Sequence, residues 1–108
     1  MSAAEALGAV APHACATMAE VRAGVDALDG QIVTLLAERF RFMDAAARIK
    51  PSRDAVRDEP RKTAVIAHAR AVANREGADA EVIGQLYEAL VEASIAHELA
   101  RWDVTRGG

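Results

Sequence analysis

The sequence is poor in residues that interrupt or cross-link a chain. Its 108 residues include three prolines, seven glycines, 4% aromatic residues and one cysteine, Cys15. A single cysteine excludes an intrachain disulfide framework and a cysteine-based zinc site. Aromatic and β-branched residues are sparse, whereas alanine, the best helix former, makes up about a quarter of the chain. This composition disfavours a β-sandwich or barrel and predicts an all-α protein.

The sequence also lacks long apolar runs and a strong charge of one sign. No run approaches the roughly 18 apolar residues of a membrane span. Thirteen basic and sixteen acidic residues give a net charge of −3, which disfavours a nucleic-acid binder. The alanine-rich residues 1–16 include Ala14-Cys15-Ala16, which superficially resembles a signal cleavage site, but they contain no lysine or arginine. We therefore expect residues 1–16 to be a disordered N-terminal tail and the protein to be cytoplasmic.

A very long first helix is predicted after this tail. Thr17 and Glu20 have the spacing of a capping box, so the helix should start near Met18. Apolar residues then recur at steps of three and four, and nothing interrupts the pattern before Pro51. This apolar seam consists of Met18, Val21, Val25, Leu28, Ile32, Leu35, Phe42, Ala46 and Ile49.

The length of this helix predicts a dimer. A helix of about 33 residues is roughly 50 Å long, whereas a compact domain of this size has a radius of gyration near ~13 Å. Part of the seam would therefore stay in water in a monomer. We expect residues 17–108 to form a three-helix chain that pairs with a second copy in an intertwined helical-bundle homodimer.

Two shorter helices are predicted to follow a loop. Pro60 fits the first turn of the second helix, with Asp58 or Glu59 as its cap, and Gly77 fits its end. Asp79 should cap the third helix, whose inner stripe is Ile83, Leu86, Leu90, Ser94, Glu98 and Trp102. We expect residues 105–108 to fray.

Polar residues on buried helix faces mark a candidate site. Arg39 continues the seam of the first helix, and Lys50, eleven residues later, lies about three turns further on nearly the same face. Ser94 and Glu98 interrupt the stripe of the third helix in the same way. Buried charges need partners, so these groups either pair with one another or line a pocket for a small anion. Eleven of the thirteen basic residues are arginine, which suits carboxylate binding but also fits a GC-rich genome.

An ordered set of motifs resembles the all-helical chorismate mutase family, which includes the isochorismate-pyruvate lyases. The motifs are Val21-Arg22, Asp26-Ala-Leu-Asp29, Leu35-Leu-Ala-Glu-Arg39, Lys50, Val56-Arg57-Asp58, Arg61 and Ser94-Ile-Ala-His-Glu98. The resemblance implies an intertwined homodimer with two shared active sites. It also implies an isomerase of the shikimate pathway and aromatic amino acid biosynthesis. That enzyme rearranges chorismate to prephenate without a cofactor, a metal or a covalent intermediate.

The resemblance also implies roles for individual residues. Arg39 would bind one substrate carboxylate, and Arg22 would reach into the partner chain's site to bind the other. Lys50 would donate to the ether oxygen of the breaking bond, with Glu98 opposite it. A further group would bind substrate at the mouth of the site and on the ring carboxylate, namely Asp58, Arg61 and Ser94.

Two departures from the family pattern leave the substrate open. Many bacterial members have glutamine where this chain has Glu98, and a glutamate can donate to the ether oxygen only when protonated. Lys62 stands where the mutases commonly have a glutamate that holds the ring hydroxyl. The C-terminal segment Arg101-Trp102-Asp-Val-Thr-Arg106-Gly resembles the isochorismate-pyruvate lyases of salicylate synthesis, whereas Ser94 and Glu98 are closer to mutases. We favour the mutase over the lyase, and either enzyme over a non-enzymatic helical dimerisation module.

Overall fold

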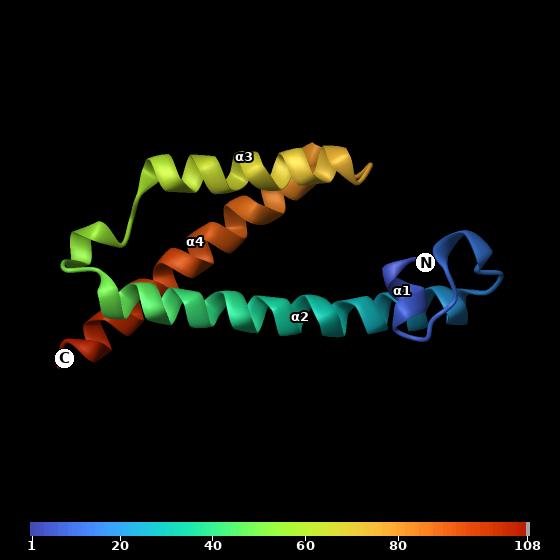
Figure 1. Ribbon diagram of the computed structural model, residues 1–108, viewed down its shortest axis with the longest axis horizontal. Helices are drawn as coiled ribbons and strands as arrows, with labels where there is room; N and C mark the ends of the chain where they lie inside the picture. The colour runs from blue at the N-terminus through green and yellow to red at the C-terminus, as the bar shows by residue number, and fades with distance from the viewer. Residues whose placement is uncertain (108) are drawn as a thin grey trace. The chain divides into compact units, whose positions relative to one another are not determined.

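The computed structural model describes residues 1–107, and these residues form helices and connecting turns without strands (Figure 1). The helices are α1 (Ala3–Ala6), α2 (Met18–Ile49), α3 (Glu59–Arg75) and α4 (Ala80–Thr105), with 3-10 helices η1 (Pro12–Ala14) and η2 (Arg53–Ala55). The prediction of an all-α chain with one very long helix is confirmed, although the predicted helices did not include α1. The chain divides into two compact units, residues 1–39 and the residues from Phe40 onward.

The first unit contains α1, η1 and α2 from Met18 to Arg39. Thr17 Oγ1 accepts from the backbone N–H of Glu20 at 3.2 Å, and Glu20 Oε1 accepts from the backbone N–H of Thr17 at 3.1 Å. These reciprocal bonds satisfy donors that the first helical turn leaves without partners. The capping box therefore starts α2 at Met18, as predicted.

The segment expected to be a disordered tail contains two short helices in the structure. Ser2 and Glu5 form a capping box around α1, with bonds of 2.8 and 3.2 Å. Gly8 has a φ of +86°, which allows the chain to turn after α1. Ala4 and Ala11 are buried. Local capping and the packing of small side chains thus give residues 1–16 a defined path.

The second unit contains the end of α2 together with η2, α3 and α4. α2 ends at Ile49 because Pro51 has no backbone N–H to continue the helix. Asp58 Oδ1 accepts from the N–H of Arg61 at 3.0 Å, so Asp58 is the cap of α3. After α3, Gly77 has a φ of +74°, and Asp79 caps α4. The predicted caps and breaks are therefore the observed ones.

The core of the second unit lies between α3 and α4, which are joined by a short turn and pack against each other (Figure 1). Val56, Val91 and Ile95 form its buried centre, flanked by Val65, Ile66, Leu99 and Trp102. This core holds η2 and the N-terminal end of α3 against α4. Over residues 1–107, none of the helices combines the length and the apolar character that crossing a bilayer requires.

The predicted fraying of residues 105–108 is wrong for the first two of them. Thr105 is the last residue of α4, and its Oγ1 donates to Arg101 O at 2.9 Å. Arg106 follows with side-chain hydrogen bonds to backbone carbonyls at the end of α2. Local bonds of Thr105 and long-range bonds of Arg106 thus order this segment. Gly108 lies outside the described residues.

Candidate active site

Lys50 and Glu98 form the centre of the candidate site in the second unit. Lys50 follows the last residue of α2, and its backbone N–H still donates to Ala46 O at 2.9 Å. Its Nζ lies 2.7 Å from Glu98 Oε2, and the exposed fractions of the two side chains are 29% and 5%. The sequence placed both residues on inner faces of their helices. The structure brings them into direct contact.

The charged pair gives the site its chemistry. A carboxylate as buried as that of Glu98 requires a charged partner, and the Lys50 ammonium supplies it. The same ammonium donates to Val56 O at 3.3 Å, which ties it to the end of η2. An ammonium has three donors. Within residues 1–107, two of them have these protein acceptors, so the third can reach an oxygen atom of a bound molecule.

Ser94 lies one turn before Glu98 on the same face of α4. It is 3% exposed, and its hydroxyl donates to Leu90 O at 2.7 Å. A serine hydroxyl can rotate, so the same group can donate to a bound carboxylate after leaving Leu90. To donate to a substrate carboxylate, as predicted, the Ser94 hydroxyl would have to give up its hydrogen bond to Leu90 O.

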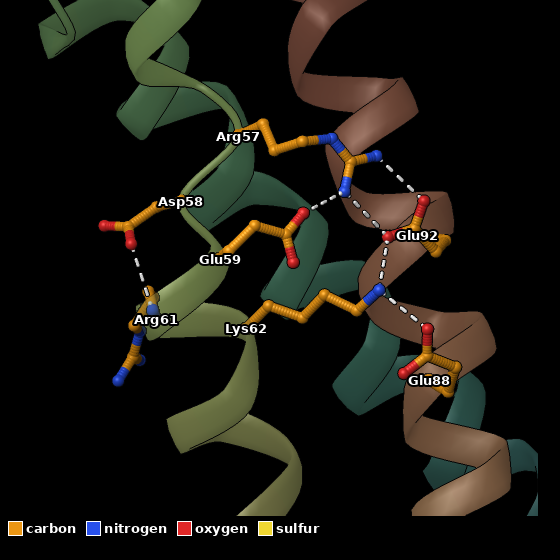
Figure 2. A network of polar contacts seen from close by, with 7 residues as sticks. All are labelled: Arg57, Asp58, Glu59, Arg61, Lys62, Glu88 and Glu92. Carbon is orange, nitrogen blue, oxygen red and sulfur yellow. Dashed lines mark hydrogen bonds and ion pairs between the residues drawn. The ribbon is translucent and has the colours of Figure 1, made fainter.

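Asp58 and Arg61 are not joined to the Lys50–Glu98 pair by any hydrogen bond or ion pair in the part of the chain that the structure describes. Asp58 caps α3 through the backbone of Arg61. Figure 2 shows both side chains on the side of α3 that faces away from Glu92. Both are exposed, so their predicted place at the mouth of a site stays a prediction.

Lys62 belongs to a network of ion pairs that joins α3 to α4 (Figure 2). Its Nζ lies 2.6 Å from Glu88 Oε1 and 2.8 Å from Glu92 Oε2. Arg57 binds Glu92 through both terminal nitrogens, at 2.9 and 3.1 Å, and contacts Glu59 at 2.8 Å. Lys62 therefore serves as a partner for two carboxylates of α4. Sequence analysis missed this role, although the spacing of Glu88 and Glu92 puts them on one face of a helix.

The network shifts the pKa values of its members. Hydrogen bonds from Arg57, and next from Lys62, lower the pKa of Glu92 to about 2 from its ordinary 4.5. Hydrogen bonds to Glu88 and Glu92 raise the pKa of Lys62. Because the pKa of Glu92 is lowered on folding, its contribution to stability is complete above about pH 4.5. That contribution is lost as the pH falls toward about 2.

Replacing Glu92 by glutamine is expected to lower the melting temperature at neutral pH. The difference from the unmodified protein should shrink between about pH 4.5 and pH 2, because acid removes the same charge from Glu92. Thermal unfolding at a series of pH values measures it. Glu76→Gln is the matched control. The Glu76 side chain is 70% exposed and its ion pair with Arg75 is long at 3.7 Å, so its loss should change stability little. A difference that stays constant with pH would contradict the expectation.

Arg22 and Arg39 lie on α2 within the first unit. Arg22 is exposed and Arg39 is half-buried. The substrate contacts expected of these arginines stay predictions. Both are candidates for binding carboxylates through a forked pair of donors.

His97 is paired with α2 rather than placed for metal binding. Its Nε2 lies 2.7 Å from Asp44 Oδ1, and its ring meets Phe40 edge-on at 5.0 Å. Arg101 Nε lies 3.4 Å from the same Asp44 oxygen. Within residues 1–107, no group of three histidine, cysteine or carboxylate side chains has an arrangement that could hold a metal ion. These contacts fasten the C-terminal half of α4 to the end of α2.

Comparisons with known proteins identify the family of the chain. The profile of the family described as chorismate mutase type II matches residues 21–99, which include α2 from Val21 onward and the Lys50–Glu98 pair. The chain is 30% identical to the isochorismate pyruvate lyase of Pseudomonas aeruginosa over 96 residues, which cover 89% of this chain and 95% of that protein. The chain therefore belongs to the type II chorismate mutase family.

Proposed function

We propose that the chain is a chorismate mutase that rearranges chorismate to prephenate. The observation that carries the proposal is the position of the Lys50 ammonium. Lys50 directly follows α2, and its Nζ contacts both the buried Glu98 carboxylate and Val56 O. The reaction breaks an ether bond and makes a carbon–carbon bond within one molecule. A preorganised cation at the ether oxygen stabilises the charge that develops there. The residues proposed need no metal or cofactor for this chemistry.

The other proposed residues bind and orient the substrate. Arg39 binds one carboxylate of the substrate, and Arg22 binds the other from the partner chain. Ser94 contacts the ring carboxylate, and Asp58 and Arg61 stand at the mouth of the site. Holding a flexible dicarboxylate in a reactive conformation removes entropy before the reaction, which is the main contribution available without covalent catalysis.

A homodimer is part of this proposal. Six large apolar side chains of the α2 seam are at least half exposed in the single chain, namely Met18, Val25, Ile32, Leu35, Phe42 and Ile49. Apolar residues at regular helical spacing form a stripe that a second helix can cover. A second copy of the chain would cover this stripe and would bring its own Arg22 to the shared site.

The second candidate is an isochorismate-pyruvate lyase, favoured by the relative from Pseudomonas aeruginosa. The two candidates differ in where the substrate carries its ring hydroxyl. Lys62 stands at the position expected to recognise that hydroxyl, and its Nζ is occupied by Glu88 and Glu92. The mutases commonly have a glutamate at this position, which accepts a hydrogen bond from the ring hydroxyl. The Lys62 ammonium cannot accept such a bond, so this position does not favour the mutase.

Product analysis with the purified protein tests both candidates. Chorismate and isochorismate are supplied in separate reactions, and the products are separated and identified. Prephenate as the dominant product supports the mutase, whereas salicylate and pyruvate at a higher rate support the lyase. Absence of product from both substrates would contradict an enzymatic role and favour a non-enzymatic dimerisation module.

Glu98→Gln tests the role of Glu98 in turnover. An ionised glutamate repels the ether oxygen, whereas glutamine can donate a hydrogen bond to that oxygen and still accept one from Lys50. We therefore expect Glu98→Gln to keep or raise kcat, measured by steady-state rates. A large fall in kcat would contradict this expectation, because it would mean that the charge of Glu98 is needed to hold the Lys50 ammonium.

A further inference from the structure

The end of α2 has a carbonyl that no backbone N–H of the next turn can satisfy. Ala47 O would accept from the N–H of residue 51 in a continuing helix, but residue 51 is proline. Arg106 Nη1 donates to Ala47 O at 2.9 Å instead. Ala47 is 0% exposed, so water has no access to this carbonyl while the Arg106 side chain is in place. Arg106 therefore supplies the missing cap of α2 from the far end of the chain.

The backbone of Lys50 is held by the same part of α4. Trp102 Nε1 donates to Lys50 O at 3.1 Å, and Arg106 Nη2 donates to the same oxygen. The Arg106 guanidinium lies 4.6 Å from the centre of the Trp102 ring, which orients the two donors together. The positive charge also lies at the C-terminal end of α2, where the helix dipole favours a cation.

One face of α4, continued by Arg106 just after its last residue, thus contacts both the side-chain ammonium and the backbone carbonyl of Lys50. Glu98, Trp102 and Arg106 follow one another at intervals of one helical turn. Glu98 binds the ammonium of Lys50, and the other two bind its carbonyl oxygen. A shift of either group relative to α4 would move the Lys50 Nζ.

The geometry points to Arg106 and Trp102 as positioning residues for Lys50. They fix the backbone from which the catalytic ammonium projects, and they act through it without touching the substrate. This inference rests on the proposed function, in which Lys50 donates to the breaking ether bond. The inference also states that Arg106 sets the environment of the Lys50 side chain. This part can be tested by a measurement that does not depend on enzymatic activity.

Arg106→Ala is expected to lower kcat by about 10- to 100-fold, because small displacements of a catalytic group are costly in rate. KM should change by less than about threefold, since Lys50 acts most strongly in the transition state. Arg106→Lys should recover part of kcat, because an ammonium keeps the charge but not the fork that reaches two carbonyls. A cap that served only the stability of α2 would lower the melting temperature and leave the kcat of the folded protein unchanged.

Arg53→Ala is the matched control. Arg53 joins η2 to Asp103 of α4 at 2.9 Å, and the two side chains are 54% and 49% exposed. The substitution removes an arginine from the same region of the unit without removing a donor to Lys50 O or Ala47 O. We expect it to leave kcat unchanged. An equal loss of kcat in Arg53→Ala and Arg106→Ala would contradict the inference, because it would indicate general loosening of this end of the unit.

A nuclear magnetic resonance measurement provides the readout that does not need activity. The chain has two lysines, Lys50 and Lys62, so a spectrum that correlates each lysine Nζ with its Cε protons contains two side-chain signals. Lys62→Arg assigns them. Arg106→Ala should shift the Lys50 signal and leave that of Lys62 in place, because Lys62 binds Glu88 and Glu92 elsewhere on α4.

The outcomes separate this inference from the proposed function. A shifted Lys50 signal in a protein that turns over neither substrate would support the positioning role and reject the enzymatic one. An unchanged Lys50 signal together with an unchanged kcat in Arg106→Ala would overturn the inference. If Arg106→Ala fails to fold, Trp102→Phe replaces it, because phenylalanine keeps the ring under Arg106 and removes only the donor to Lys50 O. The same two readouts then decide the inference.

Discussion

Replacing Lys50 by methionine is expected to lower kcat by about 10²- to 10³-fold, the usual cost of removing one donor that stabilises a developing negative charge. Methionine has a similar length and no charge, so it can occupy the space of the lysine side chain. The ammonium that would meet the ether oxygen is lost, and Glu98, whose side chain is 5% exposed, loses its cation. Steady-state kinetics with the substrate identified by product analysis measure the effect.

Two further variants separate lost chemistry from lost stability. In Lys50→Met/Glu98→Gln neither side chain is charged, so the melting temperature should recover relative to Lys50→Met while kcat stays low. Arg75→Met removes a cation that is 71% exposed at the end of α3, and it should change neither quantity. Full activity of folded Lys50→Met would remove the basis of the proposed mechanism.

Introducing a charge into the apolar seam of α2 is expected to abolish both dimerisation and turnover. Leu35 is 66% exposed in the single chain and occupies the seam that a second copy would cover. Leu35→Glu would bury a carboxylate without a partner, at a cost of roughly 3–5 kcal/mol for each copy. This cost weakens the dimer between about 10²- and 10⁴-fold for each copy. Turnover should be lost with the dimer, because the proposed site includes Arg22 from the partner chain.

Val33→Glu is the control for this experiment. Val33 is 64% exposed on the same helix, two residues before Leu35 and off the seam. Light scattering should give twice the 11.4 kDa chain mass for the unmodified protein and for Val33→Glu. Leu35→Glu should give the mass of one chain. A single-chain mass for the unmodified protein, or an active dimer of Leu35→Glu, would contradict the proposed assembly.

Local signals made the helix boundaries predictable from the sequence. The Thr17–Glu20 capping box, Pro51 and the caps Asp58 and Asp79 each act over a few residues, and each is found where it was predicted. Helix α1 carries the same kind of signal, since Ser2 and Glu5 have capping-box spacing. The alanine-rich composition of residues 1–16 instead predicted a disordered tail.

The candidate site was predictable only where a polar residue interrupts a regular apolar stripe. Lys50 and Glu98 do so on two helices, and the structure shows them in contact. Arg106 does not, because its acceptors are backbone carbonyls 56 and 59 residues earlier in the chain. Every residue has a backbone carbonyl, so the sequence does not indicate which carbonyls lack a partner. An arginine that binds such groups at a distance along the chain therefore looks, in the sequence, like an arginine exposed to solvent.

The cap at the end of α2 has a consequence for the order in which the protein is made. The ribosome synthesises α2 before α4, so the end of α2 emerges before Trp102 and Arg106 exist to hold it. Helices form in microseconds from local contacts, whereas contacts between distant residues must wait for the intervening chain. We therefore expect the orientation of Lys50 to be among the last native features acquired by a nascent chain. A translation product arrested before Trp102 would then contain the complete α2 with its lysine still unplaced.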